Sequence, residues 1–121
     1  MAEPIKSYRD LIAWQRAYEL GKRVYALAGA FPDHERFGLI AAIRRLGYSI
    51  ASQIAAGYGK GNTGDYLWHL KHARGEIYQL DTQLMFALDF KYVDEQQYEP
   101  VKAQLDEAER VLAGLIRSLD R

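Results

Sequence analysis

The sequence predicts an all-α fold, an antiparallel up-down-up-down four-helix bundle that forms a single domain over residues 1–121. Apolar residues recur every three or four positions along the chain, and no segment alternates as a half-buried strand does. Proline occurs only at Pro4, Pro32 and Pro100, and glycines cluster between Gly57 and Gly64. The predicted helices span about 8–30, 36–58, 63–89 and 94–119, and short connections between them make neighbouring helices antiparallel.

The helix predicted over 8–30 has a wide apolar face. Ser7 can cap it with Asp10 as the acidic partner of a capping box, and the Phe31–Pro32 pair ends it. Its apolar residues form two adjacent stripes: Leu11, Trp14, Tyr18, Gly21, Tyr25 and Ala28, and beside them Ala17, Leu20, Val24, Leu27 and Phe31. A four-helix core is too narrow for both stripes. We therefore expect Trp14, Tyr18 and Tyr25 to be buried between subunits of a homo-oligomer or to line the ring that the subunits form, because aromatic residues are enriched at interfaces.

The helix predicted over 36–58 combines one buried stripe with many small residues. The stripe consists of Leu39, Ile43, Leu46, Ile50 and Ile54. The small residues are Ala41, Ala42, Gly47, Ser49, Ala51, Ser52, Ala55 and Ala56. Because small side chains occupy little space between helix axes, we expect a neighbouring helix to approach closely here.

The last two helices each show a sustained heptad seam. The seams are Tyr66, Leu70, Ala73, Ile77, Leu80, Leu84 and Ala87 in the third helix, and Tyr98, Val101, Leu105, Ala108, Leu112, Leu115 and Leu119 in the fourth. Asp94 and Gln97 form a predicted capping pair. Pro100 removes a hydrogen bond within the first two turns, which predicts a kink or a helix that restarts near Glu99.

Composition excludes several classes of function. The chain has no cysteine, so disulfides, thiolate metal sites and cysteine nucleophiles are excluded. Sixteen basic and sixteen acidic residues cancel, so no bulk charge indicates nucleic acid or a membrane. The N-terminus lacks an apolar segment typical of a secretory signal, and no apolar run is long enough to span a bilayer. We expect a cytoplasmic protein.

Two short patterns resemble known sites but lie in the wrong context. Residues Gly59 to Gly64 match GxGxxG, yet a helix precedes them where a dinucleotide site needs a strand, so we interpret them as a helix end and a turn. Asp65, His69, His72 and Glu76 share one stripe of the third helix. They raise the alternative of a metal-dependent enzyme. Carboxylate bundle sites need matching ligands on facing helices, so a solvated stripe beside the core is favoured and no metal site is assigned.

Charge is distributed unevenly along the chain. From Phe37 to Gly75 five basic residues face one acidic residue, a net charge of +4, while Glu76 to Arg121 carries a net charge of −5. Tyr58, Tyr66 and Trp68 are interspersed with the cations, an arrangement that can hold phosphates and stack bases. The candidate nucleic-acid contacts are Arg44, Arg45, Lys60, Lys71 and Arg74. Complementary charge between helices or subunits is the alternative, and the opposed halves suit a head-to-tail contact.

Several segments together resemble a known family. They are L-x-x-W-Q-x-A at Leu11 to Ala17, F-P-x-x-E-R-F-G-L at Phe31 to Leu39, I-R-R at Ile43 to Arg45, S-I-x-S-x-I-A-x-G-Y-G at Ser49 to Gly59, and A-x-G-x-x-x-x-L-x-T-Q-L at Ala73 to Leu84. Over about residues 8–119 the chain resembles the four-helix bundle proteins encoded in intervening sequences of bacterial large-subunit ribosomal RNA genes. That family includes relatives of the accessory variability protein of diversity-generating retroelements.

The resemblance implies a closed bundle that assembles into a homopentameric ring, without catalytic activity or cofactor. For the retroelement relatives it implies an adaptor that binds nucleic acid and a reverse transcriptase. A structural or adaptor protein that binds another protein, without nucleic acid, stays open as an alternative. The chain departs from the family pattern at Ala51, Gln53, Ala56, Lys60, Glu76, Gln79 and Asp81. The first of these replaces a proline, which predicts a straighter second helix.

Overall fold

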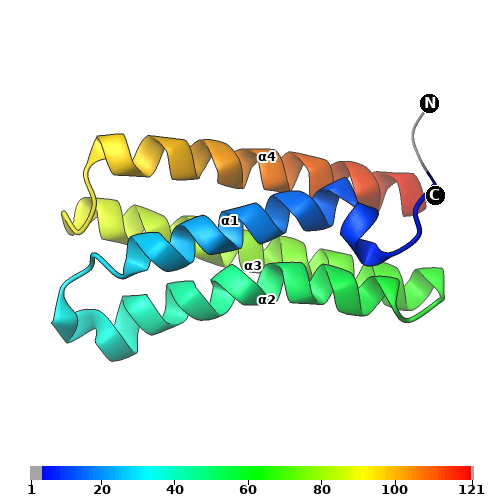
Figure 1. Cartoon of the computed structure of the whole chain (residues 1–121), viewed down its shortest axis with the longest axis horizontal. Coiled ribbons are helices and arrows are strands. Elements are labelled where there is room, and N and C mark those ends of the chain that lie inside the picture. The colour runs from blue at the N-terminus through cyan, green and yellow to red at the C-terminus, as the bar shows by residue number, and fades with distance from the viewer. Residues whose placement is uncertain (1–3, 121) are drawn as a thin grey trace.

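The chain folds into four long helices, as a computed structural model that describes residues 4–120 shows. They are α1 (Ile12–Ala28), α2 (Ala41–Tyr58), α3 (Thr63–Asp89) and α4 (Glu95–Leu119). α2 packs against α1 and α3, and α4 packs against the same two helices, so the four lie side by side as an antiparallel bundle (Figure 1). The predicted all-α fold is therefore confirmed. No helix in the described part of the chain is long and apolar enough to cross a membrane.

α1 is shorter than predicted at both ends. The predicted capping box is present, but Ser7 and Asp10 cap a separate 3₁₀ turn, Tyr8–Asp10. Leu11 is extended, with a ψ of 125°, so the regular helix begins at Ile12 rather than Tyr8. At the other end the amides of Gly29, Ala30 and Phe31 each bond three residues back, and the last turn tightens before Pro32.

α2 begins at Ala41 rather than Arg36 because Glu35 shapes the preceding segment. A 3₁₀ turn, Asp33–Glu35, leads into a wide turn, Arg36–Ile40, in which Gly38 has non-helical angles. The Glu35 carboxylate accepts the amide of Leu39 at 3.1 Å. A Cβ on Gly38 would overlap that carboxylate, so a larger residue here would displace the Glu35 side chain from its bond to Leu39. Beyond Ala41 the helix is unbroken to Tyr58, which agrees with the loss of the family's proline.

α4 runs continuously through Pro100, so the predicted restart near Glu99 is wrong. Asp94 and Gln97 form the predicted capping box, and the Tyr98 amide bonds to the Asp94 carbonyl at 2.9 Å. This first turn is complete before Pro100 removes one donor. At the other end of α4 the buried residue is Ile116, while Leu115 is only partly buried, so the predicted seam shifts by one residue in the last turns.

The core confirms most of the predicted buried positions. Of the two stripes on α1, the one containing Ala17, Leu20 and Val24 is buried. The seam of α3 is buried from Leu70 to Ala87, and Tyr66 at its start is half-buried. The predicted buried side of α2 lies in the core except for Leu39, which precedes the regular helix and is partly exposed.

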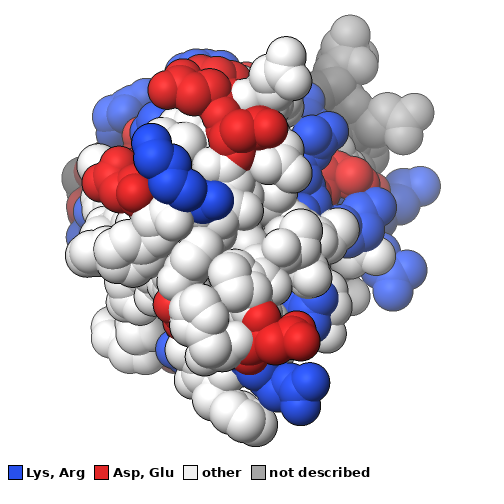
Figure 2. Space-filling model, turned by 90° about the vertical axis from the view of Figure 1, so that its left-hand side faces the viewer, with Lys and Arg blue, Asp and Glu red and all other residues white. Residues whose placement is uncertain are grey.

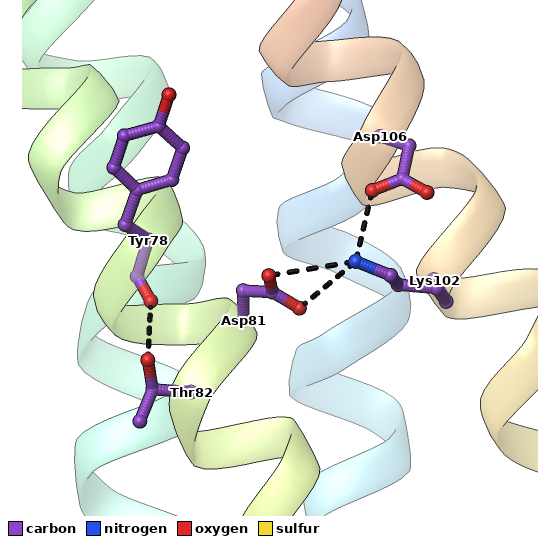
Figure 3. Close-up of polar contacts among 5 residues, drawn as sticks. All are labelled: Tyr78, Asp81, Thr82, Lys102 and Asp106. Carbon is purple, nitrogen blue, oxygen red and sulfur yellow. Dashed lines mark hydrogen bonds and ion pairs between the residues drawn. The ribbon is translucent and has the colours of Figure 1, made fainter.

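An ion pair joins α3 to α4 on the outside of the bundle. The Lys102 Nζ lies 3.2 Å from Asp81 Oδ1 and 3.0 Å from Asp106 Oδ1 (Figure 3). The hydrogen bond to Asp106, together with that to Asp81, raises the pKa of Lys102 above its ordinary value. Partly exposed pairs of this kind contribute little to the free energy of unfolding. This contact therefore helps to align two helices that the apolar core holds together.

Candidate functional site

A groove lies between α1 and α2 and contains all three residues predicted from the sequence to lie at an interface. Its volume is about 400 Å³. We call it the α1/α2 groove. It is lined by Tyr8, Trp14, Tyr18, Gly21, Lys22, Tyr25, Gly47, Tyr48, Ala51, Ser52 and Ala55. Trp14, Tyr18 and Tyr25, from the α1 stripe that begins at Leu11, thus form one wall of this groove.

The floor of the groove consists of small residues because α1 and α2 almost touch there. A Cβ on Gly21 would overlap the carbonyl oxygen of Gly47 and lie 3.0 Å from the carbonyl carbon. Along α2, Gly47, Ala51 and Ala55 follow one another at intervals of four residues, so they share one side of the helix. The close approach predicted for this small-residue helix is therefore confirmed, and it creates the hollow.

Aromatic rings form the walls. Trp14 and Tyr18 stack with their ring centroids 4.8 Å apart and their planes inclined by 16°, and Tyr8 meets Trp14 edge-on. Tyr18 and Tyr25 are 45% and 47% exposed, and Tyr48 on the opposite wall is 61% exposed. Large aromatic side chains gathered on one surface, rather than scattered singly, mark an interaction site.

Two cations lie against these rings. The Lys22 ammonium is 4.9 Å from the centroid of Tyr18, and the Arg44 guanidinium is 4.4 Å from that of Tyr25. Arg44 Nε also donates to the Tyr25 carbonyl oxygen at 3.1 Å. Arg44, which the sequence places among the candidate nucleic-acid contacts, is therefore bound to α1 at the rim of the groove. Such contacts fix the orientation of the ring.

The other four candidate nucleic-acid contacts lie apart from Arg44. Arg45 is exposed on α2, and Lys60 is exposed in the turn between α2 and α3. Lys71 on α3 pairs with Asp120 beyond the end of α4, at 3.1 Å. Arg74 is half-buried on α3. The five candidate contacts thus lie on two helices and a turn. Among them, Arg44 is bound to α1 and Lys71 is paired with Asp120.

The Asp65, His69, His72 and Glu76 stripe is divided among different partners. Asp65 bonds to the helix cap Asn62, and His69 Nδ1 lies 2.8 Å from Gln53 Oε1 on α2. His72 stacks on Trp68. Within the described residues no three histidine, aspartate or glutamate side chains are grouped so that they could hold a metal ion.

The prediction that this stripe is solvated is wrong at Glu76, which is buried. It is only 7% exposed, and its carboxylate accepts the Ser49 hydroxyl at 2.8 and 3.0 Å. The reason is the small-residue surface of α2, which lets α3 approach closely. At the same contact a Cβ on Gly57 would lie 2.6 Å from His69 Cβ.

Sequence reasoning missed an exposed apolar side of α3. Tyr78, Met85 and Phe86 are each about half exposed, at 51%, 51% and 50%. In Figure 3 the ring of Tyr78 takes no part in the contacts drawn around Lys102. The intervening outward positions, Gln79 and Thr82, are uncharged. The signal was present in the sequence, since these residues repeat at helical spacing one position away from the seam.

A further aromatic group lies at the end of the bundle where α1 leads to α2 and α3 leads to α4. Phe37 is 90% exposed and Phe90 is 52% exposed. Figure 2 looks onto this end and shows a broad uncharged surface with charged side chains mostly towards its edges. Beside it the Tyr92 hydroxyl donates to Glu35 at 2.8 Å and lies 3.1 Å from His34 Nε2.

These observations define a small antiparallel four-helix bundle that carries an aromatic groove between α1 and α2. The chain belongs to the 23S rRNA-intervening sequence protein family, which matches residues 9–114. The predicted family is therefore confirmed. A crystal structure of a protein of unknown function from the S23 ribosomal protein family of Bacteroides thetaiotaomicron VPI-5482 has a similar fold. Its TM-score is 0.80 at 21% sequence identity, over 87% of this chain and 98% of that chain. A comparison with curated proteins gives no match.

Proposed function

We propose that the protein is a non-catalytic bundle that assembles with copies of itself through the α1/α2 groove, with a pentamer as the stoichiometry implied by the family resemblance. One observation carries this proposal. Tyr18, Tyr25 and Tyr48 remain between 45% and 61% exposed, yet they line a single groove with a floor of glycine and alanine. A bundle that acted alone would gain nothing from exposing these rings together.

The free energy gained by burying exposed aromatic surface supports an interface that contains several rings. Burying the exposed half of one aromatic side chain removes on the order of 100 Å² from water, worth about 2.5 kcal/mol. Three such rings contribute roughly 7 kcal/mol, which is comparable to the cost of association. Burial of the three rings together therefore offsets a large part of that cost, while burial of any one ring alone does not.

The absence of catalysis is part of the proposal and rests on the engagement of the titratable groups of α3. His69 and Glu76 are each hydrogen-bonded to α2, and Asp65 is bonded to its own helix cap. His69 and Glu76 therefore stabilise the packing of α3 on α2, and Asp65 stabilises the start of α3. None of them faces the α1/α2 groove.

Equilibrium sedimentation of groove variants tests the assembly. Tyr18→Ala and Tyr25→Ala should each weaken association by at least about 2 kcal/mol, because rings at the centre of an interface dominate its energy. Phe37→Ala is the matched control, since Phe37 is 90% exposed but lies outside the groove. It should leave the association constant unchanged. Equal effects of all three substitutions would show that the groove is not the interface.

Nucleic-acid binding is a second candidate function, and the three cations Arg45, Lys60 and Arg74 favour it. None of them forms a salt bridge to another residue in the described part of the chain, unlike Lys71. Lys60 lies two residues after Tyr58, whose ring meets the Tyr66 ring edge-on with the centroids 6.1 Å apart. Exposed cations near aromatic rings can contact phosphates and bases.

Titration of labelled structured RNA and duplex DNA at low and moderate salt tests this second candidate. Binding should weaken steeply with salt, and Arg45→Gln with Lys60→Gln should reduce that salt dependence. The control is Arg110→Gln, which removes a cation that is already paired with Glu107 and lies outside the α1/α2 groove. No retardation at low salt with micromolar protein would end this candidate. Retention of a protein partner, such as a reverse transcriptase, after nuclease treatment would favour the adaptor alternative.

A further inference from the structure

The exposed side of α3 carries a second apolar surface that lies apart from the groove. It consists of Gly75, Tyr78, Gln79, Thr82, Met85 and Phe86, all exposed and none charged. We call it the α3 face. A helix side that faces water normally bears charged residues, so an uncharged stripe with three large apolar side chains is expected to have a partner.

The α3 face and the α1/α2 groove match in length. The floor of the groove extends along α2 from Gly47 to Ala55, and the large side chains of the α3 face extend from Tyr78 to Phe86. Both intervals are eight residues, which is about 12 Å along a helix. Tyr78, Thr82 and Phe86 recur every four residues, as do the small residues of the floor. Side chains spaced in this way can enter a groove between two helices.

Charged residues near the ends of the two surfaces favour one orientation of an incoming α3 in the groove. Asp89 lies three residues beyond Phe86, and Arg44 lies three residues before Gly47. Within the described residues neither of these two forms a salt bridge. If an incoming α3 lies antiparallel to α2 with Phe86 over Gly47, Asp89 reaches Arg44. The apolar pattern and the charge pattern therefore agree on one orientation.

We propose that the α3 face of one copy occupies the α1/α2 groove of the next copy. This inference rests on the proposed self-assembly and specifies its geometry. Each copy contributes two different surfaces, so the contact is heterologous, and repetition produces a ring when the rotation closes. A contact between two grooves, related by a twofold axis, is the competing arrangement.

Mixing two disabled variants distinguishes these arrangements. Tyr48→Glu places a charge in the groove and leaves the α3 face intact, while Met85→Glu does the reverse. Each variant alone should lose at least about 30-fold in its association constant. An equimolar mixture should form a species of two chains and nothing larger, because one intact groove then meets one intact α3 face.

Ala26→Glu is the matched control, because Ala26 is exposed on α1 outside the groove and should leave assembly unchanged. Circular dichroism verifies that each variant is folded. If Met85→Glu assembles as the wild type does while Tyr48→Glu does not, the groove is an interface but the α3 face is not its occupant. If the mixture stays monomeric, the heterologous contact is refuted. A wild-type protein that is itself monomeric would instead refute the proposed self-assembly.

Discussion

Gly21 on α1 and Gly47 on α2 meet backbone to backbone, with no room for a side chain on the α1 residue. A Cβ on Gly21 would overlap the Gly47 carbonyl oxygen. This close approach makes the floor of the groove and lets the aromatic residues of α1 stand above it as a wall. The stability of the fold and the shape of the candidate interface therefore depend on the same pair.

Alanine at this pair should destabilise the bundle unequally. Gly21→Ala should lower the free energy of unfolding by about 3 kcal/mol or more, because backbone must move to admit the methyl group. Gly47→Ala should cost less, about 1 kcal/mol, since its Cβ would meet only Val24 Cγ2 at 3.1 Å and the Gly21 oxygen at 3.2 Å. Urea unfolding measures both.

Gly114→Ala provides the control for those substitutions. Its Cβ would meet only the flexible end of Arg117 at 3.7 Å, within α4. Alanine should therefore stabilise the protein by about 0.5–1 kcal/mol through helix propensity alone. If Gly21→Ala were tolerated as well as Gly114→Ala, the close contact between α1 and α2 would be wrong.

Ser49 and Ser52 on α2 should contribute differently to the free energy of unfolding. Ser49→Ala removes the hydroxyl that donates to the buried Glu76 carboxylate, and it should cost about 1–3 kcal/mol because a charged acceptor loses its partner. Ser52→Ala removes only a bond to the Tyr48 carbonyl, four residues earlier on the same exposed helix side, and should be nearly neutral. Thermal unfolding of the two variants side by side makes the comparison, and equal losses would contradict the role given to Glu76.

Lys91 occupies a position that favours glycine. It has a φ of 67° after the end of α3, where its amide bonds to Leu88 and the amide of Tyr92 bonds to Ala87. This arrangement is a Schellman motif, in which a left-handed residue follows the helix. Lys91→Gly should raise the free energy of unfolding by about 0.5–1 kcal/mol. A loss of stability in urea would show that the turn does not require the left-handed conformation.

Glu35 should make stability depend on pH in the acidic range. The Leu39 amide, and then the Tyr92 hydroxyl, lower the pKa of Glu35 below its ordinary value of 4.5. A carboxyl group with a lowered pKa stabilises the fold above its unfolded-state pKa, and this contribution is lost as the pH falls through the folded-state value. Glu35→Gln should therefore flatten the decline in the urea midpoint between about pH 5 and pH 3. An unchanged decline would contradict the role of this carboxylate.

The sequence predicted the four helices and most of the core because heptad spacing and capping residues are local signals. The capping boxes at Ser7 and Asp94 are both present, and the seam of α3 is buried nearly as predicted. The predictions that were wrong concern backbone features that depend on contacts with a neighbouring segment. The bend at Gly38 follows from a side chain three residues earlier, and the continuity through Pro100 follows from a first turn that closes before it.

The candidate site was predictable in part for the same reason. Trp14, Tyr18 and Tyr25 could be placed outside the core because α1 has more apolar surface than one bundle can bury. Tyr8 and Tyr48, which complete the groove, come from other segments, and their proximity depends on the Gly21–Gly47 approach. The burial of Glu76 was missed because its partner, Ser49, lies 27 residues away on another helix.

The molar mass of the wild-type chain in solution tests the central claim most directly. Multi-angle light scattering over a dilution series in the micromolar range should give a multiple of the 13.9 kDa chain, with five copies as the expected number. A dimer or tetramer would retain self-assembly and exclude the pentamer. A mass of one chain at every concentration would contradict the proposal that the aromatic groove joins copies of this protein.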